Sequence, residues 1–180
     1  MKLRKGSQDA TGLTFGLVAS KFNKFVTSRL LTECVKALRK AGVADDAVEV
    51  VRVPGAFEIP LVARQLARSG RFDAVICLGA VIRGDTPHFE YISREVTRGI
   101  LQASMESNVP VIFGVLTTDT VAQALERADP EKLNRGADAA KTAIEMVNVM
   151  RLLKKDMTGD APSSAAPARP AGRSAARSKR

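Results

Sequence analysis

The only histidine of the 180-residue chain, His88, follows a polar loop at the predicted start of a helix. That loop, Gly84-Asp85-Thr86, brings a flexible backbone to a helix N-terminus, where free N–H groups and the helix dipole attract anions such as phosphate. The same dipole disfavours a second proton on an imidazole, and a neutral imidazole can accept protons. These residues indicate an acid/base group beside a phosphate site. The structural alternatives are a plain helix cap with a turn glycine and a surface histidine.

Aromatic and polar side chains also follow the first two predicted strands. Phe22 and Asn23 follow the first strand, and Phe57 and Glu58 follow the second. A phenylalanine beside an amide suits a flat heteroaromatic ligand, and a carboxylate accepts hydrogen bonds from ligand hydroxyls. As alternatives, Phe22 can pack under its own helix, and Glu58 can simply stabilise the dipole of the helix that it begins.

Arg127 closes a short predicted helix near the fourth predicted strand. A C-terminal arginine commonly interacts with the dipole of its own helix. A guanidinium also has the planar fork that binds phosphate, and in an oligomer it can complete the site of a neighbouring subunit. The sequence alone leaves both roles open.

The segments that position these residues alternate between apolar runs and helical periodicity, which is typical of βα units around a parallel sheet. We expect strands over residues 13–20, 47–53, 74–81 and 111–116, and helices over 24–41, 57–69, 86–107, 120–128 and 133–155. Glycines at 42 and 70 should end the first two helices, and Thr86 should cap the third, with Pro87 at its first position.

This pattern predicts a three-layer α/β/α sandwich of flavodoxin-like type with a four-stranded parallel sheet. Ligands of such open sheets bind beyond the carboxyl ends of the strands. Apart from Arg127, the candidate residues described above follow the ends of the first three strands. We therefore expect them to share one rim of the sheet.

The C-terminal segment differs from the rest in composition. Residues 161–180 contain only Ala, Pro, Ser, Gly, Arg and Lys, and offer no large apolar side chain to a core. We expect a single domain over 1–156 and a disordered tail over 157–180. The tail holds so many basic residues that the first 160 residues carry only +4 of the net +9. A solvated extension is its simplest role, and polyanion binding is the alternative.

Cysteine usage and hydropathy indicate the cellular compartment of the protein. Cys34 and Cys77 fall in apolar segments without a CxxC partner or a second metal ligand. We therefore expect two buried thiols, no disulfide and no metal site. The basic N-terminal residues precede no apolar run, and no stretch approaches the roughly 20 apolar residues that span a bilayer. A cytoplasmic protein without membrane association is expected.

Six motifs occur in order: KFN at 21–23, VPGAFEIP at 53–60, LGAVIRGDTPHFEYI at 78–92, PVIFGVLTTDT at 110–120, QALERA at 123–128 and AIEM at 143–146. Together they resemble the lumazine synthase family of riboflavin biosynthesis over about residues 12–150. The resemblance implies condensation of 5-amino-6-ribitylaminouracil with 3,4-dihydroxy-2-butanone 4-phosphate. The products would be 6,7-dimethyl-8-ribityllumazine, phosphate and water, and no cofactor or metal would be needed.

The resemblance also implies residue roles. His88 would transfer protons, and the phosphate would lie at Gly84, Asp85 and Thr86, with Arg127 added from an adjacent subunit. The residues expected to contact the ribitylaminouracil are Phe22, Asn23, Ala56, Phe57, Glu58, Ala80, Val81, Ile82 and Phe113.

A homo-oligomer is implied as well, either a pentamer or a sixty-subunit icosahedral shell, with handover of the product to riboflavin synthase. The segment DPEKLNR at 129–135 replaces a more glycine-rich family turn that influences assembly, so the sequence does not choose between the two sizes. Nor does it assign a role to Arg135, which keeps a positive charge in that segment. No nucleic-acid partner is expected except through the tail.

A second hypothesis is a relative that has lost catalysis, binds flavin or forms a shell, and recruits a polyanion through its tail. The joint presence of Phe22, Glu58, His88 and Arg127 favours the enzyme.

Overall fold

Four parallel strands form one sheet in the order β2-β1-β3-β4. The computed structural model describes residues 1 and 3–157. The central strands are β1 (Phe15–Ser20) and β3 (Ala74–Ile82), and the edges are β2 (Val48–Val53) and β4 (Val111–Thr118). β1 and β3 are buried along almost their whole length, as expected of strands that are covered on both faces.

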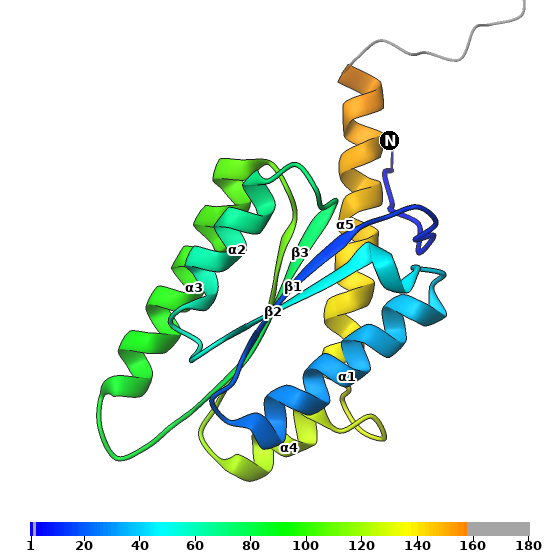
Figure 1. The fold of residues 1–180 in the computed structure, drawn as a ribbon. Helices are drawn as coiled ribbons and strands as arrows, with labels where there is room; N and C mark the ends of the chain where they lie inside the picture. Colours follow the sequence, from blue (N-terminus) through cyan, green and yellow to red (C-terminus); the bar gives the residue numbers. More distant parts are fainter. Residues whose placement is uncertain (2, 158–180) are drawn as a thin grey trace, which may run out of the picture.

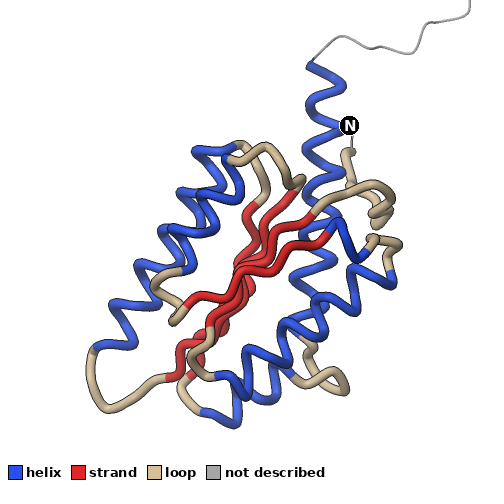
Figure 2. The backbone as a smooth tube through the Cα atoms, viewed as in Figure 1, coloured by secondary structure: helices blue, strands red, loops and turns tan. Residues whose placement is uncertain are grey.

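Helices cover both faces of the sheet (Figures 1 and 2). On one face lie α1 (Lys24–Lys40), α4 (Val121–Ala128) and α5 (Arg135–Met157). On the other lie α2 (Ile59–Arg68) and α3 (His88–Ser107). The predicted three-layer sandwich with a four-stranded parallel sheet is thus confirmed.

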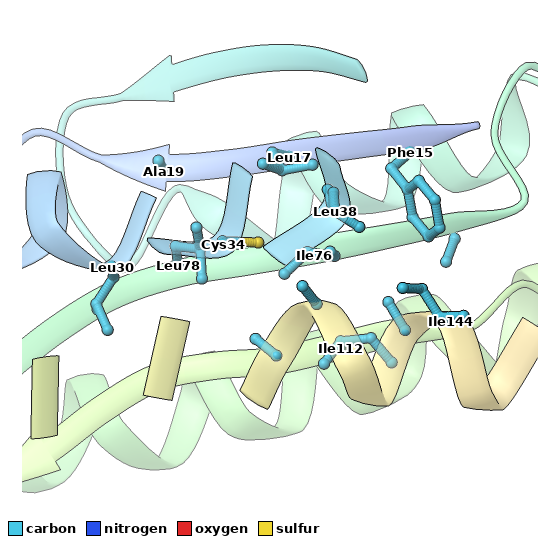
Figure 3. Packing of buried hydrophobic residues seen from close by; sticks show 14 of the residues in the cluster. Phe15, Leu17, Ala19, Leu30, Cys34, Leu38, Ile76, Leu78, Ile112 and Ile144 are labelled. Carbon is cyan, nitrogen blue, oxygen red and sulfur yellow. The ribbon is translucent and has the colours of Figure 1, made fainter. Parts of the chain in front are cut away.

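The alternation of side chains along β1 divides the core in two. Phe15, Leu17 and Ala19 pack against the α1/α4/α5 layer, where Figure 3 shows them beside Leu30 and Leu38 of α1. The intervening residues of β1 face the α2/α3 layer. Full burial of a leucine or phenylalanine side chain stabilises the fold by roughly 1.5–3 kcal/mol, so a register slip of one residue would be costly.

Helices α1 and α5 pack closely because a small residue lies between their backbones. A Cβ added to Gly136, in the first turn of α5, would lie 2.4 Å from the carbonyl oxygen of Leu30. Only a glycine allows the α5 backbone to approach α1 this closely. The contact fixes the start of α5, and with it Arg135, against the body of the domain.

The register of the strands places their carboxyl ends together at one end of the sheet. Ser20 pairs with Val53, and Ile82 pairs with Thr118. Backbone hydrogen bonds continue the pairing beyond the strands, since the Lys21 N–H donates to the Val53 carbonyl at 2.7 Å. The loops that follow all four strands therefore lie at the same end of the sheet, the end at which the strands finish.

Strand ends differ from the prediction by one or two residues. The first strand begins at Phe15 instead of residue 13, because the Asp73 carboxylate accepts the Thr14 N–H at 2.8 Å. β4 continues to Thr118 instead of residue 116, because the Thr118 carbonyl accepts the Arg83 N–H at 2.9 Å.

Helix starts also differ from the prediction by up to two residues. Thr86 does not cap α3: the helix begins at His88, and the Pro87 carbonyl accepts the Glu90 N–H at 3.0 Å, so Pro87 occupies the N-cap position. α2 begins at Ile59 instead of residue 57, after a turn. α5 begins two residues later than predicted, and a short 3₁₀ turn over 45–47 was not predicted.

The glycine caps are confirmed, since Gly42 and Gly70 follow α1 and α2 with φ of 93° and 72°. Met157, assigned to the tail by sequence, belongs to α5. The remaining predicted tail, 158–180, lies outside the described residues. In the described part of the chain, no helix is long and apolar enough to cross a membrane. The same part holds no group of three or more candidate metal ligands.

Both cysteines are free and buried, as predicted, on opposite faces of the sheet. Burial raises the pKa of the Cys34 thiol to about 12, and it also raises the pKa of Cys77. Neither thiol should form the reactive thiolate near neutral pH.

We therefore predict that iodoacetamide at about pH 8 leaves the native protein unmodified and alkylates both cysteines after unfolding in guanidinium chloride. Mass spectrometry of the intact chain distinguishes zero, one and two adducts. Rapid alkylation of the native protein would contradict the observed burial.

Candidate active site

A cavity of about 660 Å³ opens beyond the carboxyl ends of β1, β2 and β3. This volume lies within the range of roughly 300–1,000 Å³ that is usual for small-molecule sites. Its lining comes from the loops after these strands, from the last residues of β3 and from the first turns of α3. The lining residues are Phe22, Asn23, Gly55, Ala56, Phe57, Glu58, Ala80, Val81, Ile82, Gly84, Thr86, His88, Phe89 and Ile92.

Two phenylalanines line the cavity without being buried in the core. Phe22 is 70% exposed and Phe57 is 58% exposed. The alternative in which Phe22 packs under its own helix is therefore wrong. Exposed aromatic faces at a concave site favour a flat apolar ligand, because a ligand would remove that surface from water.

Asn23, next to Phe22, anchors the loop between β1 and α1. Its φ of 53° lies in the left-handed region, which asparagine tolerates better than most residues. Its Nδ2 donates to the Ala80 carbonyl at 3.0 Å, and its own carbonyl accepts the Val26 N–H at 2.9 Å at the start of α1. Asn23 therefore joins the end of β3 to the start of α1, and one amide hydrogen bond of its side chain is committed to the protein.

Glu58 has a structural contact and also faces the cavity. Its Oε2 accepts the Gly55 N–H at 2.8 Å, which closes the turn that leads into α2. Its Oε1 has no hydrogen-bond partner among the described residues and is left to accept from a ligand. The structural and functional roles considered for this carboxylate are thus compatible.

The loop from Gly84 to Thr86 is exposed, and Gly84 and Thr86 line the cavity. Within the described chain, none of its three backbone N–H groups donates to a protein acceptor. His88, the first residue of α3, is exposed and lines the same cavity. Asp85 is exposed and does not line the cavity. Free N–H groups in the loop that leads into α3, close in sequence to an accessible imidazole, are compatible with anion binding and acid/base chemistry.

Phe113 and Arg127 lie elsewhere. They line a second cavity of about 530 Å³ at the free edge of β4, together with Arg135 and Asp138. No residue lines both cavities. Within one chain the structure thus separates Phe113 from His88, although the family resemblance implied that they border the same pocket. The physical reason is strand order, since β4 is the edge strand and Phe113, its third residue, lies well before its carboxyl end.

The second cavity is electropositive. Arg135 forms an ion pair with Asp138 at 3.1 Å, whereas Arg127 has no carboxylate partner among the described residues. Arg127 donates from Nη1 to the Gln123 carbonyl of its own helix at 3.3 Å, as the structural alternative expects. Its half-buried guanidinium still retains donors, and an anion at this cavity would satisfy them.

Sequence reasoning missed Gly55, Phe89 and Ile92 as lining residues. Phe89 and Ile92 are three residues apart in α3 and so share a helix face, a spacing that pointed to them. Gly55 lies in the turn before α2, next to residues that were chosen. No local sequence pattern indicated that Asp138 would line the second cavity.

In a comparison with protein-family models, residues 12–151 match a model described as 6,7-dimethyl-8-ribityllumazine synthase. The matched range begins before β1 and ends within α5. It includes every lining residue of both cavities.

The position of Asn23 yields a stability prediction. Asn23→Gly loses the bond to Ala80, whereas Asn23→Ala loses the bond and also strains the positive φ by roughly 1–2 kcal/mol. We therefore expect Asn23→Ala to be the less stable variant by about 1 kcal/mol. Urea denaturation at one fixed protein concentration measures the difference. Equal stabilities of the two variants would contradict the strained position.

Proposed function

The chain belongs to the 6,7-dimethyl-8-ribityllumazine synthase family, a transferase family of riboflavin biosynthesis, and from this premise we propose that it catalyses the family's condensation. Its substrates would be 5-amino-6-ribitylaminouracil and 3,4-dihydroxy-2-butanone 4-phosphate. The observation that carries this proposal is the first cavity, which gathers exposed aromatic rings, a carboxylate, an open anion-binding loop and the only histidine of the chain.

The pyrimidine is proposed to stack on Phe22, with Phe57 and the backbone at Ala80–Ile82 completing its pocket. Stacking on an exposed ring adds roughly 0.5–1.5 kcal/mol beyond the area that it buries. The free Oε1 of Glu58 would accept hydrogen bonds from ribityl hydroxyls. Asn23 would contribute mainly by holding Phe22 in place, because its amide nitrogen already bonds to Ala80.

The phosphate of the second substrate is proposed to bind the free N–H groups of residues 84–86 and the Thr86 hydroxyl. Asp85 would keep its carboxylate away from the anion, consistent with its absence from the cavity lining. Arg127 would reach the same phosphate from the partner subunit, because within one chain it lies at the second cavity.

We extend the same argument to Phe113. It is 42% exposed on an otherwise largely buried strand and shares the second cavity with Arg127. If Arg127 of the partner subunit meets the phosphate, Phe113 of that subunit approaches the first cavity as well. The proposed site would therefore be formed by two faces of the chain, which would require a homo-oligomer.

The chemistry needs proton transfer more than a strong nucleophile. The amine adds to the ketone carbonyl and water leaves; phosphate is then eliminated, the chain tautomerises, and the ribityl-bearing nitrogen closes the ring with loss of water. His88, which lines the cavity, would accept and return these protons. Acid/base catalysis contributes about 10²–10⁴-fold, and holding two substrates together contributes as much or more.

We predict that the purified protein, given both substrates, produces the absorbance and fluorescence of the lumazine. His88→Ala should lower kcat by roughly 10²–10⁴-fold and leave a measurable rate. Complete loss of turnover in a folded His88→Ala protein would show that positioning contributes less than proposed. Flavin binding without any product from the wild-type protein would instead support the non-catalytic relative.

A mixing experiment tests whether two subunits form the site. His88→Ala and Arg127→Ala proteins, each of low activity alone, are unfolded together and refolded as mixed oligomers. If the site is shared, some interfaces combine an intact His88 with an intact Arg127, and activity rises above both parents. Separately refolded and then combined proteins are the control. Activity that never exceeds the parents would contradict a shared site.

A further inference from the structure

Arg83 lines neither cavity, yet its guanidinium makes three contacts beside the first one. Its Nε donates to Asp119 Oδ1 at 2.7 Å, and its Nη1 donates to Glu90 Oε1 at 2.5 Å. Its Cζ also lies 4.2 Å from the centroid of the Phe89 ring, which lines the cavity. One side chain therefore contacts the start of α3 and the junction between β4 and α4.

These contacts span the anion-binding loop. Arg83 precedes residues 84–87, which join β3 to α3 in Figure 1, and Glu90 follows them. Gly84, Asp85 and Thr86 make no hydrogen bond within the described chain. The loop is thus fixed at its two ends. Arg83 supplies side-chain interactions there, one with Glu90 after the loop and one with Asp119 at the junction between β4 and α4.

The charges around Arg83 argue against direct phosphate binding. Hydrogen bonds from Arg83 to Asp119 and then to Glu90 raise its pKa, so it stays cationic. Two carboxylates already neutralise that single charge, in contrast to Arg127, which has no carboxylate partner among the described residues. An additional anion would meet a net negative cluster here.

We propose that Arg83 is a positioning residue, which sets the conformation of the 84–87 loop and hence the places of the phosphate and of His88. This inference rests on the proposed function. The role requires arginine, because a lysine cannot donate from two fixed directions while it stacks on the Phe89 ring.

The test compares Arg83→Lys and Arg83→Met with Arg71→Met. Arg71 is a matched control at the opposite end of the sheet, since it stacks over Phe72 at 4.7 Å and pairs with Glu49 at 2.6 Å. Steady-state kinetics gives kcat and the KM of each substrate, inhibition by inorganic phosphate reports the anion loop, and thermal unfolding reports stability.

In both Arg83 variants we expect the KM of the butanone phosphate and the inhibition constant of inorganic phosphate to rise by roughly tenfold or more. We expect kcat to fall, while the KM of the ribitylaminouracil changes by about twofold or less, because Phe22 and Phe57, against which the pyrimidine is proposed to lie, come from the loops after β1 and β2. Arg71→Met should match the wild type in all four kinetic values.

Three results would overturn the inference: wild-type behaviour of Arg83→Lys, equal changes in both KM values, or a loss of thermal stability without a change in kinetics. Should Arg83→Met fail to fold, Glu90→Gln weakens the same contact across the loop and must reproduce the selective effect. Absence of wild-type turnover would overturn the proposed function together with this role. Wild-type turnover that the Arg83 variants leave unchanged would overturn the role alone.

Discussion

Parallel pairing of β1 with β2 on one side and β3 on the other is the constraint from which the remaining geometry follows. Because β1 and β3 are buried on both faces, their side chains permit only one register. That register aligns Ser20 with Val53 and places the loops that follow the strands at one end of the sheet. A single amide, Asn23 to the Ala80 carbonyl, then joins two of these strand ends directly. The sheet thus brings the loops that form the site to one place.

The same strand order divides the candidate chemistry. The three strands β1, β2 and β3 end at the cavity that holds the aromatic rings, Glu58 and His88, whereas β4 forms a free edge that carries Phe113 near Arg127. A half-buried arginine and an exposed phenylalanine on a free edge are unfavourable features of an isolated chain. Association of chains would cover both residues. The proposed catalysis and the proposed oligomer therefore both depend on the surface at the second cavity.

Local patterns in the sequence determined much of this. Apolar runs, helical periodicity and the glycines at 42 and 70 predicted the element order and the sheet, because these signals act over a few residues. Competing hydrogen bonds decided the ends: Asp73 shortens β1, and the Pro87 carbonyl replaces Thr86 as the cap of α3. Arg83 escaped prediction because its partner Asp119 is 36 residues away, and the separation of Phe113 from His88 depends on strand order. Long-range pairing of this kind leaves no periodic signal.

The central claim is that one phosphate is bound jointly by the loop after β3 and by an arginine from another subunit. The most direct measurement is an experimental structure of the assembled protein with 5-amino-6-ribitylaminouracil and inorganic phosphate bound. The account predicts phosphate on the N–H groups of residues 84–86, beside His88, with Arg127 of the partner subunit completing its coordination. Phosphate bound by residues 84–86 without a partner subunit nearby, or bound only at the second cavity of the same chain, would contradict it.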